Sequence, residues 1–322
     1  MKYDFITIGG ATEDITFYTS EGVLISNKKD LTRQKLLAFE YDAKIKIDKS
    51  FSGFGGGAAN AAVACSRLGF KSACLCAVGD DLRGEDILDN FKKQGVATAL
   101  AQKITGAETG FSFLLVGPAN EHICFSNRAA NNELRITNHE LRIIKNAGWI
   151  YLTSLSGNWQ AALAKIFSVH GPKIAWNPGH RQIIRGVKAL GRYFKKTGCL
   201  IVNKDEAIEL ALSFKKNRTG LNQIKNLLVA LASLGPRIVV ITNGRHGADA
   251  IGENKIYHQP IVKEKKRLDT TGVGDAFGSS FVAGLELYHN DIKRALFLAA
   301  KNSAAEISRQ GAQQGLLRKQ EI

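Results

Sequence analysis

The sequence predicts an α/β protein of three layers, with a mainly parallel sheet between two helical layers and a small β-sheet lid. Three observations predict this class. Short segments rich in Val, Ile and Leu alternate with longer amphipathic segments, two regions interrupt the alternation with β-prone pieces, and glycines cluster where segments meet. A length of 322 residues suffices for one large domain with a smaller lobe.

The predicted core strands are short and apolar: Tyr3–Ile8, Ser72–Val78, Trp149–Thr153, Lys173–Trp176, Cys199–Val202 and Arg237–Thr242. Helical patterns lie between them at Ala58–Leu68, Glu85–Gln94, Asn138–Asn146, Gln160–His170, Asp205–Phe214 and Asn222–Leu234. A hairpin of Ala248–Ile251 and Lys255–Gln259 follows, then helices over Val273–Tyr288 and Ile292–Arg309. We expect the chain from Gln313 onward to be irregular. Strands that alternate with helices in this way favour a parallel sheet.

The lid is expected from two interruptions of this alternation. Residues 15–50 contain the β-prone pieces Thr16–Tyr18, Val23–Ser26 and Leu37–Ile47. Residues 110–127 resemble a hairpin with a turn at 117–120. We therefore expect residues 1–14, 51–109 and 128–322 to form the core, and 15–50 with 110–127 to form the lid.

Composition excludes several classes of protein. No apolar run is long enough for a membrane span, and the first residues lack the features of a signal peptide, so a cytoplasmic protein with no membrane partner is expected. Five cysteines without metal-ligand spacing predict reduced, buried thiols. The net charge of +15 comes from Lys/Arg clusters scattered over many segments, with no nucleic-acid motif. Such a field attracts anions such as nucleotides, and no specific nucleic-acid partner is expected.

The most informative motif is DTTGVGDAF, residues 269–277, which leads into an apolar helical stretch. Gly272, Val273 and Gly274 would turn the chain into a helix start, where free N–H groups and the helix dipole bind anions. Asp275 in the first turn could accept a hydroxyl proton beside that anion. An ordinary capped helix is the competing interpretation of a lone Gly-x-Gly-Asp.

This motif resembles the C-terminal signature of the ribokinase-like (PfkB) family of carbohydrate and nucleoside kinases. The family's N-terminal signature resembles residues 53–60, GFGGGAAN, followed by Val78-Gly79-Asp80-Asp81 and Gly84. The similarity runs from Gly9 to Gly311. The resemblance implies a ribokinase-like fold and transfer of the γ-phosphoryl group of ATP to a sugar hydroxyl, with Asp275 as general base and Gly272–Gly274 as the anion hole.

The resemblance also implies two sets of ligand contacts. The substrate residues would be Asp14, Gly56, Gly57 and Asn60, with Arg128 and Asn131 as further candidates. The nucleotide residues would be Asn203, Thr242, Gly244, Gly247 and Asn302. Glu206 would hold Mg²⁺ through water, and Asp269 resembles a position that takes part in monovalent-cation binding, such as K⁺, in some members.

Alternatives remain open. A sugar is the first choice of substrate and an adenosine-type nucleoside the second, because the lid contains Phe17, Tyr18, Phe111, Phe113 and Phe125, which could either contact a base or form the lid's own small core. A basic nucleic-acid-binding protein on a kinase fold is less favoured, since both glycine loops, Glu206 and Asp275 are present. A nicotinamide-dependent dehydrogenase is disfavoured because no G-x-G-x-x-G follows the first strand. A homodimer joined through the lids is also expected.

Overall fold

The largest sheet has eight strands in the order β16-β15-β14-β13-β12-β11-β1-β6. The computed structural model describes residues 2–27, 35–117, 122–215 and 219–322. The six strands from β6 to β14 are parallel, and β15 and β16 add an antiparallel hairpin at one edge. Their bounds are β1 Phe5–Ile8, β6 Ser72–Leu75, β11 Trp149–Leu152, β12 Lys173–Trp176, β13 Cys199–Asn203, β14 Ile238–Thr242, β15 Ala248–Gly252 and β16 Lys255–Gln259. The predicted mainly parallel sheet is confirmed.

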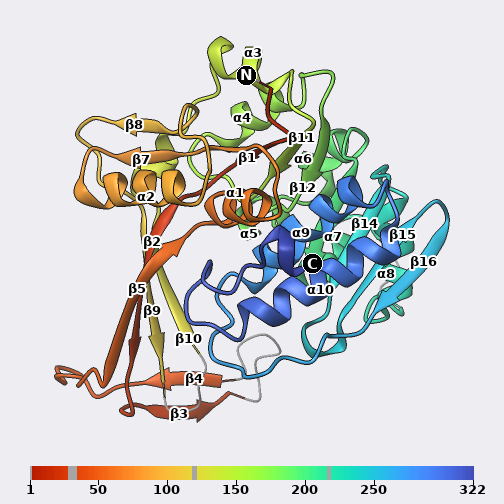
Figure 1. Ribbon diagram of the computed structural model, residues 1–322. Helices are drawn as coiled ribbons and strands as arrows, with labels where there is room; N and C mark the ends of the chain where they lie inside the picture. Colours follow the sequence, from red (N-terminus) through yellow and green to blue (C-terminus); the bar gives the residue numbers. More distant parts are fainter. Residues whose placement is uncertain (1, 28–34, 118–121, 216–218) are drawn as a thin grey trace.

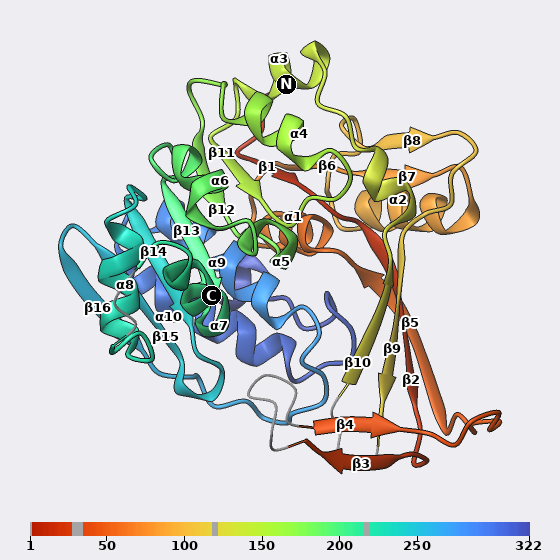
Figure 2. The ribbon, with the colours of Figure 1, turned by 180° about the vertical axis from the view of Figure 1, so that it is seen from behind.

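Helices cover both faces of this sheet (Figures 1 and 2). Side chains of a strand point alternately to its two faces, so Phe5 joins one apolar cluster and Ile6 and Ile8 join the other. The first cluster includes residues of α1 (Gly57–Arg67), α9 (Val273–Leu287) and α10 (Ile292–Glu306). The second includes residues of α3 (Asn138–Ile144), α4 (Trp159–Ile166), α5 (His180–Ile183), α6 (Gly186–Phe194), α7 (Lys204–Leu212) and α8 (Ile224–Ala232). The three predicted layers are therefore present.

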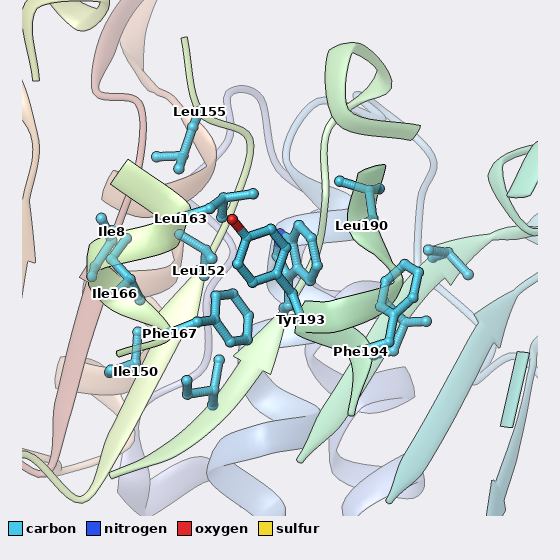
Figure 3. Packing of buried hydrophobic residues seen from close by; sticks show 14 of the residues in the cluster. Ile8, Ile150, Leu152, Leu155, Leu163, Ile166, Phe167, Leu190, Tyr193 and Phe194 are labelled. Atoms are coloured by element: carbon cyan, nitrogen blue, oxygen red, sulfur yellow. The ribbon is translucent and has the colours of Figure 1, made fainter. Parts of the chain in front are cut away.

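The second cluster packs around large rings (Figure 3). Phe167, Tyr193 and Phe194 contact the ring of Trp176, which is fully buried, at centroid distances of 5.4–6.3 Å. Full burial of aromatic side chains contributes strongly to stability. This rigid layer supports the strands whose carboxyl ends carry the candidate site.

A separate four-stranded sheet, which we call the small sheet, has the order β10-β9-β2-β5. Its strands are β10 His122–Asn127, β9 Phe111–Val116, β2 Thr12–Tyr18 and β5 Lys49–Gly55. The small sheet extends away from the helical layers, with the pair β3 (Val23–Ser26) and β4 (Lys35–Ala38) at its far end (Figures 1 and 2). Because β2 starts at Thr12 and β5 at Lys49, the expected boundaries at residues 14 and 51 fall inside strands. Most of the predicted strand Leu37–Ile47 is irregular, and residues 118–120 of the predicted turn lie outside the described residues.

Other segments also differ from the prediction. The predicted strand Ser72–Val78 is two strands, β6 and β7 (Ala77–Gly79), and β7 pairs with β8 (Gln102–Ile104). Helix α2 (Leu82–Lys93) begins earlier than expected because the Asp81 carboxylate accepts a bond from the Gly84 N–H. Helices α5 and α6 were not predicted, and short 3₁₀ turns occur at Ala129–Glu133, Gly244–His246 and Lys319–Glu321. Within the described ranges, no helix is both long and apolar enough to cross a bilayer.

Candidate active site

The candidate site lies where parallel strands of the large sheet end. Strands β1, β11, β13 and β14 all run in one direction, so their carboxyl ends lie at one edge of the sheet. Ligands of open α/β sheets bind at this edge. The predicted residues Asn203 and Thr242 end strands β13 and β14, Glu206 follows in the next helix, and Gly244 and Gly247 lie in the loop after β14.

The start of helix α9 presents unpaired N–H groups. Gly272 caps the helix with a φ of 74°, and a side chain there would meet Ala312 at 2.6 Å, so the turn needs glycine. Within the described chain, the backbone N–H groups of Gly272, Gly274 and Asp275 have no hydrogen-bond acceptor. A Cβ at Gly274 would meet open space. These free N–H groups support the anion site predicted at the helix start, which stays a prediction.

Asp275 lies in the first turn of α9, and Asn60 and Gly57 bring helix α1 against it. The Asn60 Nδ2 donates to the Asp275 Oδ2 at 2.8 Å, and a Cβ on Gly57 would lie 3.2 Å from the Asp275 Oδ1. Burial raises the pKa of Asp275, and the Asn60 bond opposes that rise. A carboxylate with a raised pKa beside free N–H groups suits proton removal from a hydroxyl.

Asp14 was predicted at the end of the first strand. It lies a few residues beyond the end of β1, on strand β2. The Thr12 Oγ1 donates to its Oδ1 at 3.0 Å. Burial raises the pKa of Asp14 to about 6, the bonds from Thr12 and Ser112 oppose the rise, Asp275 adds to it, and Arg128 opposes it. The two carboxylates therefore lie close enough to interact, with Arg128 near Asp14.

Two predicted substrate residues serve mainly to fix the backbone. A Cβ on Gly56 would lie 2.5 Å from the Gly10 carbonyl oxygen, so Gly56 allows α1 to approach the loop after β1. The buried Asn131 amide accepts from the Ala11 N–H at 3.0 Å and donates to the Ala11 carbonyl at 2.9 Å. Asn131 thus orients the chain that leads to Asp14, and its amide is already engaged.

A cavity of about 370 Å³ lies on the other side of the start of α9. Its volume is in the range of small-molecule sites. Predicted residues Asn203, Thr242, Gly244, Gly247, Val273 and Gly274 line it, together with apolar Ile261, Val262, Phe277, Ala300 and Ile307 and the basic residues Arg245 and Arg267. An apolar wall, two positively charged arginine side chains and a glycine-rich loop together suit a nucleotide.

The other predicted nucleotide and metal residues have varied surroundings. Asn203 and Glu206 form a capping box at α7, where Glu206 accepts from the Asn203 N–H at 2.8 Å, and burial raises the pKa of Glu206. The Asp269 oxygens accept from the Thr271 and Gly311 N–H groups at 2.9 and 3.0 Å. Asn302 is outside the cavity lining; its buried amide contacts the Ser280 hydroxyl and accepts from the Leu317 N–H.

Sequence reasoning missed several polar residues of the site. Gln313 donates to Asn60, Asn90 donates to Gln313, and Thr12 donates to Asp14. The only sequence signal for Gln313 was its place after Gly311 in the C-terminal part of the resemblance. Asn90 looked like any polar residue of an amphipathic helix.

A carboxylate with a raised pKa at a helix start, with a second carboxylate on one side and a nucleotide-sized cavity on the other, suits a small-molecule phosphotransferase with an alcohol group as acceptor. In a comparison with known protein families, residues 30–319 match the family described as "pfkB family carbohydrate kinase". The chain belongs to this family.

Curated relatives and solved structures agree with this class. An ATP-dependent ribose-1-phosphate kinase of Halopiger xanaduensis is 27% identical over 273 residues, covering 85% of this chain and 86% of the relative. A ribokinase of Mus musculus is 26% identical over 260 residues, covering 78% of each. The nucleoside kinase of Methanocaldococcus jannaschii has the same fold, with a TM-score of 0.79, 20% identity and coverage of 99% and 96%.

Proposed function

We propose that the protein transfers the γ-phosphoryl group of ATP to a hydroxyl of a small sugar. The observation that carries this proposal is the position of Asp275. Its carboxylate lies next to Asp14 and Gly57 on one side, while Val273 and Gly274 of the same helix start line the 370 Å³ cavity on the other. A sugar on the first side and ATP on the second would meet at the free N–H groups.

The chemical step then follows from the residues at the helix start. A sugar hydroxyl oxygen attacks the γ-phosphorus, the bond from that phosphorus to the β,γ-bridging oxygen breaks, and ADP leaves. Asp275 takes the hydroxyl proton, and the free N–H groups of Gly272, Gly274 and Asp275 stabilise negative charge on the transferring group. Asp14 and the second N–H of the Asn60 amide would orient the sugar hydroxyls.

The positions of three phenylalanine rings of the small sheet favour a sugar over a nucleoside. Asp14 pairs with Ser112, and Ile15 with Phe113, so Asp14 and Phe113 point to opposite faces. On the face away from Asp14, Phe113 meets Phe17 edge to face at a centroid distance of 4.9 Å and stacks with Phe125 at 5.5 Å. These rings therefore pack with each other, which leaves them unable to contact a base beside Asp14.

Two carboxylates of this chain suit the metal ions that the family implies. Glu206 would hold Mg²⁺ through water, because only one of its oxygens is engaged, by the Asn203 N–H, among the described residues, and hard cations prefer oxygen ligands. Mg²⁺ supplies neutralisation of phosphate charge. Asp269 would contribute to a K⁺ site, since each of its oxygens accepts one N–H bond and keeps a lone pair.

A substrate panel tests the proposal. ADP formation would be followed with ribose, fructose, adenosine, cytidine, and buffer alone, at fixed ATP and Mg²⁺. We expect a sugar to give the highest kcat/KM. A nucleoside preferred by more than about tenfold, or ~1.4 kcal/mol of transition-state binding, would replace the sugar with a nucleoside as the substrate. No turnover above the ATP-only rate with any acceptor would contradict the proposal.

A further inference from the structure

Three buried amide side chains form a continuous hydrogen-bonded chain that ends on Asp275. Asn90 Nδ2 donates to Gln313 Oε1 at 2.9 Å, Gln313 Nε2 donates to Asn60 Oδ1 at 2.9 Å, and Asn60 Nδ2 donates to Asp275 Oδ2 at 2.8 Å. The amides come from α2, the segment after α10, and α1. All three residues are at most 8% exposed. We call this series the amide chain.

The direction of the amide chain follows from its end. An ionised carboxylate only accepts hydrogen bonds, so Asn60 must present its NH₂ group to Asp275 and its oxygen to Gln313. Gln313 must then present its NH₂ group to Asn60 and its oxygen to Asn90. Every donor therefore points toward Asp275, and the aligned amide dipoles stabilise negative charge there, the more so because the surroundings are of low polarity.

We infer that Gln313 and Asn90 are positioning residues of the phosphoryl-transfer reaction, which act through Asn60 to fix the orientation of the Asp275 carboxylate and stabilise its charged form. This inference rests on the proposed role of Asp275 as general base. Neither residue contacts the cavity or Asp14. Both should therefore affect the rate of transfer without affecting the binding of ATP.

The titratable groups that interact with Asp275 must be considered in any pH test. They are Asp14 on β2, Tyr151 on β11 and Glu306 on α10. The variants below leave all three in place. A difference between variant and parent in the acid limb of kcat therefore reports on Asp275.

Gln313→Met keeps the size of the side chain and removes both hydrogen bonds. We expect kcat to fall about three- to tenfold, with KM for ATP changed less than twofold, because both hydrogen bonds that link Gln313 into the amide chain are lost. The acid limb of kcat should move to higher pH by about half a unit. Asn90→Leu should act in the same direction and more weakly, since two amides separate it from Asp275.

Gln182→Met is the matched control. Gln182 is fully buried, accepts from the Gly179 N–H and donates to the Leu155 carbonyl, so its replacement removes the same kind of bonds from partners outside the amide chain. It should lower stability without moving the acid limb of kcat. If Gln313→Met and Gln182→Met give the same kcat and the same acid limb, the amide chain only packs and the inference is wrong.

A second measurement needs no sugar or nucleoside. The urea midpoint of unfolding at pH 7 would be measured for Gln313→Met in the parent and in an Asp275→Asn background. We expect Gln313→Met to lower the urea midpoint more in the parent than in the Asp275→Asn background. Only an ionised carboxylate at position 275 requires every amide donor to point toward it. Equal drops would overturn the inference. An inactive parent with unequal drops would refute the proposed function and leave the amide chain supported.

Discussion

The Asp14 carboxylate fills the space that a side chain at position 55 would need. A Cβ built on Gly55 would lie 1.8 Å from the Asp14 Oδ2, and the two residues belong to the paired strands β2 and β5. Any larger residue at position 55 must displace Asp14. The glycine therefore fixes where the predicted sugar-binding carboxylate can lie.

Gly55→Ala should raise KM for the sugar at least tenfold, because the Asp14 carboxylate must turn away from the hydroxyls it binds. KM for ATP should change little, since the cavity is lined by other residues. Gly191→Ala on the helix α6 is a suitable control, because its Cβ would meet only the Val187 side chain, at 3.3 Å. An unchanged sugar KM for Gly55→Ala would remove Asp14 from the site.

The raised pKa of Asp14 predicts an acid limb in kcat/KM. Asp14 binds hydroxyls best when ionised, and its pKa is about 6, so kcat/KM should fall as the pH drops through 6. Asp14→Asn should show lower kcat/KM at pH 7 and a changed acid limb, to which Asp275 still contributes. The same variant should unfold at higher urea at pH 7, since ionisation of a group with a raised pKa weakens the fold as pH rises from 3.8 to 6. A parent profile flat between pH 5 and 7 would contradict the assignment.

Glu306 predicts a pH-dependent loss of stability. It is fully buried, one oxygen accepts from the Gly315 N–H at 2.9 Å, and the other has no hydrogen-bond partner among the residues that the structure describes. Burial raises the pKa of Glu306 from 4.5 to about 8. Ionisation therefore costs stability progressively as the pH rises from 4.5 through 8. Glu306→Gln should be more stable than the parent at pH 7, by about 3 kcal/mol, and similar to it near pH 4.5.

Glu140→Gln provides a control of opposite sign for this experiment. Burial would raise the pKa of Glu140, but the hydrogen bonds from the Thr137 N–H and hydroxyl outweigh this effect. The pKa of Glu140 is therefore lowered. Its replacement should reduce stability at pH 7, measured by urea unfolding. A Glu306→Gln variant less stable than the parent at pH 7 would show that Glu306 is paired when ionised.

The sequence predicted the large sheet well because its strands and helices are determined by local patterns. The run of apolar residues at 199–202 and the periodic pattern at 205–214 belong to neighbouring elements of the chain. The small sheet was harder, because Asp14 pairs with Ser112 and Gly53 across long separations. Its strands therefore cross the expected boundaries, and the helices at 180–194 were missed between two strands that were found.

The site was predicted where a motif is contiguous and missed where contacts are long-range. Gly272 and Asp275 lie in one motif, and the structure places them together with free N–H groups as expected. Gln313 contacts Asn60 across 253 positions of the chain, and a single sequence read by itself carries no sign of that contact. Asn302 was predicted to contact the nucleotide from the resemblance alone, and the structure buries its amide against Ser280, outside the cavity lining.

Dimerisation through the small sheet remains a prediction, supported by its exposed apolar residues. Phe125 is 52% exposed on the face away from Asp14, and Val23, Leu24 and Ile25 at the far end are 43–66% exposed. Such surface is commonly covered by a partner. Light scattering should show twice the 35.0 kDa chain mass at micromolar concentration, and Phe125→Ser should shift the protein toward monomer. A monomeric parent would contradict a homodimer.

The role of Asp275 as general base is tested most directly by Asp275→Asn. The amide keeps the shape and the contact with Asn60 but cannot take the hydroxyl proton. We predict that kcat on the best acceptor of the panel falls by about 10²–10⁴, while calorimetry shows ATP affinity within a few-fold of the parent. A variant that turns over at a near-normal rate would contradict the account.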